Sequence, residues 1–542
     1  NVTNSNGTVT SVGVSGSDGI EVDSGSPITT SGTIALGLNR ATTRNFLNVP
    51  GVNVLDYLTD SAEKAKVLAF DNSQTAATVT TMFTDAIAAM KTSGEKYLYF
   101  PSGLYLINSS TVTALDDFKL IGLGAQIQYA SGDSIFKFTT CHRWEISGFK
   151  FTSTASAYAD VSFLYVSTDS GFFNIHNNTF DNFQRSGVRL ENLYDNGGAE
   201  TEGCVVHNNL FIDSANYSND LQAGVSLLTD GEYSKVFMNE FRNVPSAARF
   251  VGGANGVFSH NNCLLVNGDV YDASYTNAVV YCAAGANNTG KIDILFNKIN
   301  HNATGIAAIV IKGDSAAGLN AFKIIGNDIL VHGLGTTKAD LIYLDEAPYC
   351  IIAQNKLRGV ATPVDSCLIL NDSEECIVEG NYFIKTVNAI ELTGTSTNVV
   401  LGNNVFDSTV TTKYSVASTS SFKSNDRIII YCSDLTTDLT TGTGNGFLIA
   451  PYDMYVNEVY AEVVTAPTGS VVTADINDGG TTILSTKLTI DANETSSRTA
   501  ATTAVISDNS ILEGVIITCD IDAVGSTTTG KGLVITMYVT KL

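Results

Sequence analysis

Acidic side chains recur at one position of a repeating pattern in the second half of the chain. Asp345 and Glu346 directly follow an apolar-x-apolar segment, and Asp372 follows a similar segment one repeat later. Aligning the two segments places Glu346 and Asp372 in one column and Asp345 beside Asn371. Glycosidases use two carboxylates, about 5 Å apart in retaining enzymes and about 6.5–9.5 Å apart in inverting ones. We therefore predict Glu346, Asp372 and Asp345 as catalytic residues of a glycoside hydrolase; the alternative is that they are solvated turn residues.

Two further residues near this column have side chains suited to holding a sugar. Tyr343 is an outward-facing aromatic residue in the segment before Asp345, where its ring could stack on a pyranose face. Lys312 lies one repeat earlier and could keep one carboxylate ionised while the pKa of another is raised. We expect both to bind substrate.

Arginine and glutamate residues form a second candidate group in the first half of the chain. Arg185, Arg189, Glu191 and Asp195 lie close together in sequence, and Arg249 falls two repeats after Arg189 in the same outward column. Arginine binds sugar carboxylates in a bidentate manner, and a polysaccharide lyase needs a base and a cation facing the uronate. We expect Arg189, Arg249 and Glu191 to bind substrate; the alternative is surface pairing that contributes under about 1 kcal/mol.

For the other polar clusters we favour a structural role over metal binding or catalysis. An exposed histidine pair could bind metal, and carboxylate and amide oxygens could bind calcium, but stacked histidines and a β-turn account for the same residues. We predict no metal and no cofactor, and expect tyrosines in the long loops to contact a ligand. The residues concerned are the histidines His176, His207 and His260, the C-terminal turn residues Asp475, Asn477 and Asp478, the turn carboxylates Asp230 and Glu232, and the tyrosines Tyr194, Tyr217, Tyr233 and Tyr275.

These candidates are positioned by a ladder of short similar segments that runs from Trp144 to Phe406. Each segment reads apolar-x-apolar, a polar turn, then Asn-x-large apolar, and successive asparagines are 23 to 35 residues apart. Such a period is typical of a solenoid, and asparagine suits a turn because it tolerates left-handed backbone geometry. The ladder asparagines are Asn178, Asn209, Asn239, Asn262, Asn297, Asn327, Asn355, Asn381 and Asn404.

A second apolar strand follows each asparagine by about ten residues, as in Val188-Arg-Leu190 and Ile342-Tyr-Leu344. Alternation of apolar and polar residues sends one face of each strand into a shared core. Two columns that stay in phase over nine repeats predict an all-β fold with a right-handed parallel β-helix, a single-stranded solenoid, over residues 111–412.

The segment before the solenoid resembles a known family. Val52-Asn-Val-Leu-Asp-Tyr57, an amphipathic helix near Thr78–Thr92 and Lys96-Tyr-Leu-Tyr-Phe-Pro-Ser-Gly-Leu-Tyr-Leu-Ile107 are similar to the start of pectate-lyase-like β-helices. Met82, Ile87 and Met90 form an apolar stripe that can cover the first coil. The chain departs from the family in having Leu58-Thr-Asp60 and Gln74-Thr-Ala76 where Gly-Asp-Gly and paired aspartates are common. We expect residues 51–110 to form the first coil and its capping helix.

Both ends of the chain add a second resemblance. Gly7-Thr-Val-Thr-Ser-Val-Gly13, followed by Gly25-Ser-Pro-Ile-Thr-Thr-Ser-Gly-Thr-Ile34, resembles a repeat of bacteriophage tail fibres and tailspikes. Residues 1–50 lack a core of their own, so we expect a virion-attachment segment ordered by association. After a linker at 413–424, seven short strands predict an antiparallel, jelly-roll-like β-sandwich over 425–542. Phe447-x-Ile-Ala-Pro451 and Ala466-Pro-Thr-Gly-Ser470 resemble the C-terminal sandwich of environmental phage tail proteins.

Composition excludes several classes of protein. The net charge is −24 and no basic run is present, which argues against nucleic acid or an anionic membrane as partner. No apolar run approaches the roughly 18 residues of a membrane span, and no signal peptide is visible. The nine cysteines lack zinc-like spacing, so we expect buried thiols and no disulfide framework. The chain begins at Asn1 without methionine, which leaves open whether residues precede it.

The resemblance implies a phage tailspike or receptor-binding tail fibre, located on the virion outside the cell. Its expected partners are host surface polysaccharide (O-antigen or capsule), two further copies in a homotrimer, and a tail, baseplate or adaptor protein at the N-terminal segment. Three functions remain open. The chain cleaves the glycan with a carboxylate pair, or it only binds glycan through the sandwich or the solenoid loops, or, remotely, it is a secreted polysaccharide lyase.

Overall fold

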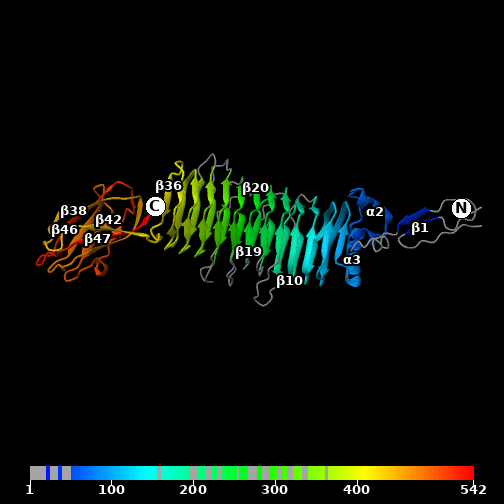
Figure 1. Ribbon diagram of the computed structural model, residues 1–542, viewed down its shortest axis with the longest axis horizontal. Helices are drawn as coiled ribbons and strands as arrows, with labels where there is room; N and C mark the ends of the chain where they lie inside the picture. Colours follow the sequence, from blue (N-terminus) through cyan, green and yellow to red (C-terminus); the bar gives the residue numbers. More distant parts are fainter. Residues whose placement is uncertain are drawn as a thin grey trace, which may run out of the picture. The chain divides into compact units, whose positions relative to one another are not determined.

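The computed structural model of the 542-residue chain describes residues 20–24, 35–38, 51–154, 160–193, 204–214, 222–228, 234–252, 256–266, 278–283, 292–301, 307–313, 322–331, 340–359 and 364–542. The chain divides into two units, Asn1–Arg249 and Phe250–Leu542. In both units, strands of successive coils stack side by side and run parallel (Figure 1). The predicted parallel β-helix is therefore confirmed.

The first unit begins with a short hairpin and two helices. Strands β1 (Ile20–Ser24) and β2 (Ala35–Leu38) pair antiparallel; the rest of the predicted attachment segment lies outside the described residues. β3 (Val52–Asn53) and a 3-10 turn (Val54–Tyr57) precede helices α2 (Ser61–Leu68) and α3 (Ala76–Ser93). Helix α3 matches the predicted capping helix, whereas α2 was not predicted.

Helix α3 buries the apolar stripe that the sequence indicates. Met82, Ile87 and Met90 are all buried. The ring of Phe83 on the same helix stacks on Phe136 at a centroid distance of 4.5 Å. The helix thus closes the apolar interior of the first coils, as expected for a cap over an open sheet edge.

Strands in the first unit continue to its boundary. Val188 and Leu190 pair with Val225 and Leu227 one coil later, which confirms the second apolar column. The strands are β4 (Tyr97–Phe100), β5 (Gly103–Thr113), β6 (Lys119–Gly122), β7 (Ala125–Thr139), β8 (His142–Ser147), β9 (Lys150–Thr152), β10 (Ser162–His176), β11 (Thr179–Asp181), β12 (Ser186–Leu193), β13 (Val205–His207), β14 (Leu210–Ile212), β15 (Ala223–Leu228), β16 (Ser234–Phe237), β17 (Glu240–Arg242) and β18 (Ala248–Val251).

The second unit carries three columns of parallel strands. The first column is β19 (Gly256–Ser259), β22 (Ile292–Leu295), β25 (Lys323–Ile325), β28 (Ile351–Ala353), β31 (Ile377–Glu379) and β34 (Val400–Leu401). The second is β20 (Asn262–Val266), β23 (Lys298–His301), β26 (Asp328–Val331), β29 (Lys356–Arg358), β32 (Tyr382–Ile384) and β35 (Val405–Phe406). The third is β21 (Ala278–Ala283), β24 (Ala307–Lys312), β27 (Ile342–Asp345), β30 (Val364–Asn371), β33 (Thr386–Thr393) and β36 (Thr412–Val416).

The ladder asparagines are bonded from coil to coil, and they are buried except at the last coil, where Asn404 is half-buried. The side-chain oxygen of Asn327 accepts hydrogen bonds from the backbone N–H (2.9 Å) and the amide Nδ2 (3.0 Å) of Asn297. Its own Nδ2 donates to the Ile294 carbonyl (2.9 Å) and to Asn355 Oδ1 (2.9 Å). The same pattern links Asn178, Asn209 and Asn239 in the first unit. Since buried polar groups must be paired, the ladder fixes the register of the coils.

Two details of the predicted ladder are wrong. Asn261, not Asn262, is the buried member, because Asn261 N–H donates to Asn297 Oδ1 at 2.9 Å. The left-handed residue is also not the ladder asparagine but the residue before it, with φ of 51° at Asn208, 53° at Met238 and 55° at Phe296. The asparagine is selected by its amide hydrogen bonds rather than by its backbone conformation.

Cysteines behave as buried apolar residues. All nine are free thiols inside the protein, and burial raises the pKa of Cys204 to about 11. Cys204, Cys350 and Cys376 directly precede strands β13, β28 and β31, as predicted. These thiols contribute to packing.

Residues 413–424 are not a free linker. β36 pairs in register with β33, so the β-helix continues past residue 412. The buried ring of Phe422 then packs edge-on against Tyr455 at 5.1 Å. The Thr- and Ser-rich composition hid this strand, in which no residue is fully buried.

The C-terminal part is an antiparallel β-sandwich, as predicted. One sheet has the order β37-β47-β39-β45 and the other β38-β46-β40-β41, with β43 paired to β40. The strands are β37 (Asp426–Tyr431), β38 (Gly442–Ile449), β39 (Met454–Glu462), β40 (Val472–Asp478), β41 (Thr481–Thr482), β42 (Leu484–Thr486), β43 (Leu488–Ile490), β44 (Val505–Ile506), β45 (Ser510–Ile511), β46 (Ile516–Ala523) and β47 (Val534–Lys541). β38 was not predicted. Among the described helices, none has the length and apolarity needed to cross a membrane.

Candidate functional site

The predicted carboxylate column brings two aspartates together through one amide. Asn371 Nδ2 donates to Asp345 Oδ1 at 2.7 Å and to Asp372 Oδ2 at 3.0 Å. These two bonds laid end to end put an upper limit of 5.7 Å on the distance between the two carboxylate oxygens. The limit is compatible with the about 5–5.5 Å separation of carboxyl groups in retaining glycosidases.

The two aspartates sit at the end of adjacent strands in the second unit. Asp345 pairs in register with Asn371, and Lys312 pairs with Asp345 one coil earlier. Asp372 adopts a left-handed turn (φ 46°) and accepts a hydrogen bond from Thr395 N–H at 2.8 Å. This turn places the Asp372 carboxylate within hydrogen-bond distance of Asn371 Nδ2, which also binds Asp345.

Tyr343 lies beside the same pair. It is half-buried, and burial raises the pKa of its phenol to about 12, with Asp345, Asp372 and Asp340 acting in the same direction. The neutral phenol is therefore a hydrogen-bond donor near two carboxylates. Glu346 is exposed at a left-handed turn (φ 50°). Asp345 and Asp372 are thus the two carboxylates that one amide joins, and the pair of Glu346 with Asp372 stays a prediction.

In the first unit, the arginine group is built around a tyrosine that the sequence analysis did not select. The Tyr165 ring lies between Lys137 Nζ (4.7 Å from the centroid) and the Arg189 guanidinium (4.5 Å). Glu191 accepts from Tyr165 O–H at 2.7 Å and pairs with Arg189 at 2.6 Å. The parallel register Lys137–Tyr165–Arg189 could have identified Tyr165.

Most cations of this group are already neutralised. Arg185 is buried and paired with Asp160, and Arg189 is paired with Glu191. Arg249 lies in the same outward column as Arg189. Arg189 pairs with Ser226 one coil later, and the hydrogen bond from Val225 N–H to the Ala247 carbonyl (3.0 Å) sets the register that places Arg249 beside Ser226. Asp195 lies outside the described residues. The cluster is a self-paired network, which leaves little free charge for a uronate.

His176 and His207 stack on consecutive coils, as predicted. Their ring centroids are 5.0 Å apart, and His207 stacks in turn on Phe237 at 5.0 Å. Each His Nδ1 lies 3.0 Å from the side-chain amide nitrogen of the following asparagine, Asn177 or Asn208. An amide nitrogen can only donate, so each Nδ1 is an acceptor and the proton is on Nε2.

This tautomer disfavours the metal alternative, because both ring nitrogens of His176 are engaged. Its Nε2–H donates to Glu145 Oε1 at 3.1 Å. Burial, with His176 next to it, lowers the pKa of His207. His260 lies outside the strand column of His176 and His207. It follows the end of β19 and occupies a left-handed turn with φ of 54°. No group of three potential metal ligands occurs among the described residues.

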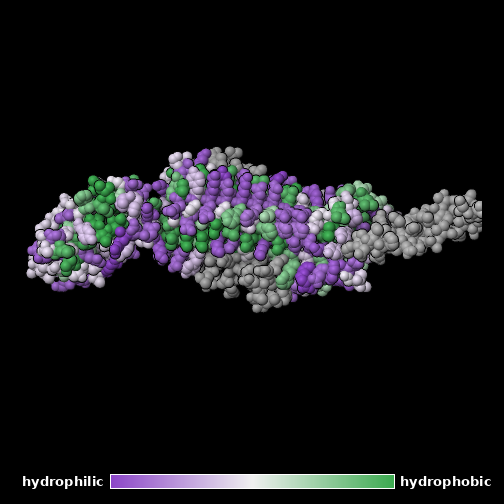
Figure 2. Space-filling view, in the orientation of Figure 1, coloured by the Kyte–Doolittle hydropathy of each residue, from purple (hydrophilic) through white to green (hydrophobic). Residues whose placement is uncertain are grey.

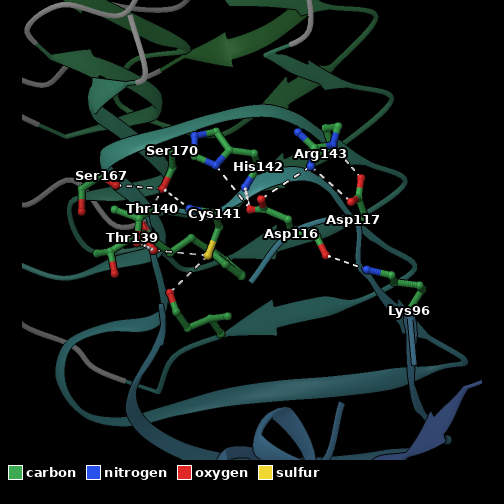
Figure 3. Close-up of polar contacts among 12 residues, drawn as sticks. Lys96, Asp116, Asp117, Thr139, Thr140, Cys141, His142, Arg143, Ser167 and Ser170 are labelled. Atoms are coloured by element: carbon green, nitrogen blue, oxygen red, sulfur yellow. Dashed lines mark hydrogen bonds and ion pairs between the residues drawn. The ribbon is translucent and has the colours of Figure 1, made fainter. Parts of the chain in front are cut away.

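A groove of about 420 Å³ opens beside Glu145 on the outside of the first coils, and sequence analysis did not find it. At its edge Arg143 binds Asp117 through bonds of 2.6 and 3.2 Å, and Lys96 donates to the Asp116 carbonyl at 3.3 Å (Figure 3). The groove is lined by Lys96, Tyr97, Asp117, Phe118, Lys119, Arg143, Trp144, Glu145 and Asn174.

Its two carboxylates are acceptors rather than acids. Arg143 lowers the pKa of Asp117. Burial raises the pKa of Glu145, but hydrogen bonds from Lys119 and His176 outweigh it and lower the pKa overall. Both groups stay ionised near neutral pH, so the groove can bind polar groups but lacks the proton donor that glycoside hydrolysis needs.

The remaining sequence candidates that the structure describes lie in strand β40 of the C-terminal sandwich. Asp475 and Asn477 are buried in strand β40 rather than in the predicted turn, which instead falls at Gly479 and Gly480. Asp475 pairs with Lys487 Nζ at 3.0 Å. Asp230, Glu232, Tyr194, Tyr217, Tyr233 and Tyr275 lie outside the described residues.

No protein-family model and no curated protein matches the chain. Among solved structures, the Dettilon tailspike protein gp208 is 13% identical, covering 91% of this chain and 95% of its own, with a TM-score of 0.44. The surface adhesin PfbA of Streptococcus pneumoniae is 15% identical over 68% of this chain and 99% of its own, with a TM-score of 0.42. The tailspike protein of Acinetobacter baumannii phage AM24 is 11% identical over 86% of this chain and 80% of its own, with a TM-score of 0.35.

Proposed function

We propose that this chain is a bacteriophage tailspike or receptor-binding tail fibre that recognises host surface polysaccharide, either O-antigen or capsule. In this proposal the protein acts on the virion tail, outside the cell, and its N-terminal segment attaches to a tail, baseplate or adaptor protein. The sequence resemblance at both ends supports the assignment. The β-helix supports it physically, because coils about 4.8 Å apart present side chains at a spacing close to that of sugar units.

One observation carries the proposal that the glycan is also cleaved. Asp345 and Asp372 share the amide of Asn371 next to the neutral phenol of Tyr343. The upper limit of 5.7 Å between their oxygens is compatible with a retaining glycosidase, in which one carboxylate attacks the anomeric carbon and the other donates a proton to the leaving oxygen and later activates water. Lys312 and Tyr343 would then contact the sugar.

The principal alternative is an adhesin that binds without cleaving. A solenoid by itself does not imply an enzyme. A lyase is less well supported, because Arg189 and Arg185 are paired with Glu191 and Asp160.

Purified host surface polysaccharide, incubated with the protein and sized by gel filtration, tests the proposal. We expect the parent chain to shorten the glycan, and Asp345→Asn and Asp372→Asn to slow shortening by at least about 100-fold, as for loss of a general acid–base group. Glu346→Gln should retain most activity. Proton NMR of the first product should show retained anomeric configuration.

Glu379→Gln is the matched control, since Glu379 is an exposed carboxylate at the end of β31 in the same unit. Equal shortening by all variants would remove catalysis from this pair. Binding without shortening by the parent would establish the adhesin instead. A parent chain that neither binds nor shortens the polysaccharide of any strain to which the phage adsorbs would contradict the proposed function.

We also propose that the protein is a homotrimer, and two short outward rows of apolar residues in the second unit support this. Apolar side chains gather over the sheet that contains β19 (Figure 2). In register, Ile351 pairs with Ile377 and Ile377 with Val400, and Leu295 pairs with Ile325. All five are only partly buried in the single chain. Contiguous apolar surface of this kind is typical of subunit contacts.

Lysine substitutions at the paired residues Ile351 and Ile377 test the proposed trimer. Ile351→Lys with Ile377→Lys is expected to convert a trimer to a monomer, because two ammonium groups per chain would be buried without partners. Light scattering after gel filtration measures the mass. Gln354→Lys, at an exposed turn next to β28, should leave the trimer intact. A monomeric parent chain, or a trimer that survives both lysines, would refute this interface.

A further inference from the structure

A second cavity lies within the unit Phe250–Leu542, where the last turn of the β-helix meets the sandwich. Its volume is about 630 Å³, within the roughly 300–1,000 Å³ of small-ligand pockets. From its chemistry we propose that it binds a neutral saccharide. The inference rests on the proposed function for the class of ligand, and it adds a site separate from Asp345 and Asp372. The cavity is lined by Val416, Ala417, Ser418, Ser420, Ser421, Tyr455, Asn457, Glu458, Val459, Tyr460, Leu488, Ser497, Thr503, Ala504, Val505, Ile506, Ser507 and Asn509.

The cavity walls are fixed by contacts that do not involve a ligand. Tyr455 is held edge-on by Phe422 at 5.1 Å. Asn509 Nδ2 donates to the Val456 carbonyl at 2.7 Å, and Lys413 pairs with Asp453 at 3.1 Å across the junction. A preformed pocket loses little entropy on binding, which favours affinity for a small ligand.

Three lining hydroxyls are available to a ligand. Within the described part of the chain, the side chains of Ser418, Tyr455 and Thr503 have no hydrogen-bond partner. Each can donate one hydrogen bond and accept others, which suits vicinal sugar hydroxyls. Apolar side chains such as Val505 and Ile506 face the same space and can contact the C–H face of a pyranose ring.

The charge of the lining selects against acidic sugars. All lining residues are described, and none is lysine, arginine or histidine. The single carboxylate, Glu458, accepts from Tyr460 O–H at 2.9 Å. The nearby Arg498 covers the Tyr460 ring at 3.5 Å and donates to Tyr538 Oη at 3.3 Å. Arg498 is also paired with Glu462 at 3.7 Å. A uronate in this cavity would therefore face a carboxylate with no cation in the lining to compensate it, whereas a neutral sugar meets no such penalty.

Saturation-transfer NMR on the full chain tests this site. The neutral probes are the methyl glycosides of glucose, galactose, mannose and N-acetylglucosamine, and the charged probes are those of glucuronic and galacturonic acid. We expect saturation transfer to at least one neutral glycoside and none to the uronates. Tyr455→Phe, which keeps the ring and removes the hydroxyl, should weaken binding about fivefold to tenfold, the value of one hydrogen bond.

Ser418→Trp should abolish the signal by filling the cavity from its exposed rim. Thr441→Trp, at an exposed position of the sandwich outside the cavity, is the matched control and should leave the signal unchanged. Absence of saturation transfer to every neutral probe, a signal that survives Ser418→Trp, or equal transfer to the uronates would each overturn the inference. Polysaccharide binding by the parent chain is not used in this test, so its failure is distinct from failure of the proposed function.

Discussion

Replacement of Asn327 by leucine is expected to lower the free energy of unfolding by about 2–4 kcal/mol, because buried polar groups would lose hydrogen-bond partners at about 1–3 kcal/mol each. The groups that lose a bond are the Asn297 N–H and Nδ2, the Ile294 carbonyl and Asn355 Oδ1. Asn297 Nδ2 keeps its bond to the Phe258 carbonyl, and Asn355 Oδ1 keeps its bond from the backbone N–H of residue 327. Leucine has a similar volume, so packing should change little. Guanidinium-induced unfolding, followed by circular dichroism, measures the difference.

Asn403→Leu provides the control for this substitution. Asn403 is exposed and adjacent to the ladder member Asn404, so the same chemical change should shift the unfolding midpoint only slightly. An Asn327→Leu variant as stable as the Asn403→Leu variant would show that the ladder contributes no net stability. Loss confined to the coils around Asn327, seen by hydrogen exchange, would agree with a solenoid in which each coil contacts only its neighbours.

The ladder shows how far the sequence predicts this fold. Repetition of Asn-x-apolar identified the coils, because each coil must satisfy the same geometry. It could not choose between Asn261 and Asn262, since the choice depends on which amide reaches Asn297. The strand β36 was missed for a related reason: its residues Thr412 to Val416 have little apolar pattern, and only pairing with β33 reveals them.

The candidate site was predictable in part. The strand register placed Asp345 beside Asn371, as alignment indicated. Alignment could not show that the Asn371 amide reaches Asp372, because that contact depends on a left-handed turn at Asp372. Tyr165 was missed because a tyrosine in an apolar strand looks like a core residue until its neighbours Lys137 and Arg189 are known.

The aromatic column of the first unit leads to the second large expected effect. Phe211 stacks between Phe180 at 4.7 Å and Phe241 at 4.8 Å, and it is fully buried. Phe211→Ala should destabilise the protein by about 3–5 kcal/mol through the lost burial and the cavity left behind. Phe447→Ala is the control, since Phe447 is 69% exposed and its loss should change the unfolding midpoint little.

Gly187 packs against the Phe211 ring, so substitutions at both positions can measure how strongly the two residues are coupled. A Cβ added at Gly187 would lie 2.6 Å from Phe211 Cε1, so Gly187→Ala should be destabilising in the parent chain. The same alanine should cost much less when Phe211 is already alanine, because the atom it strikes is gone. The double-mutant cycle measures this coupling, expected at about 1–3 kcal/mol for residues in contact. Additive effects would mean that the Phe211 ring does not pack against Gly187. The destabilisation by Gly187→Ala would then come from the backbone around β12 rather than from contact with the ring.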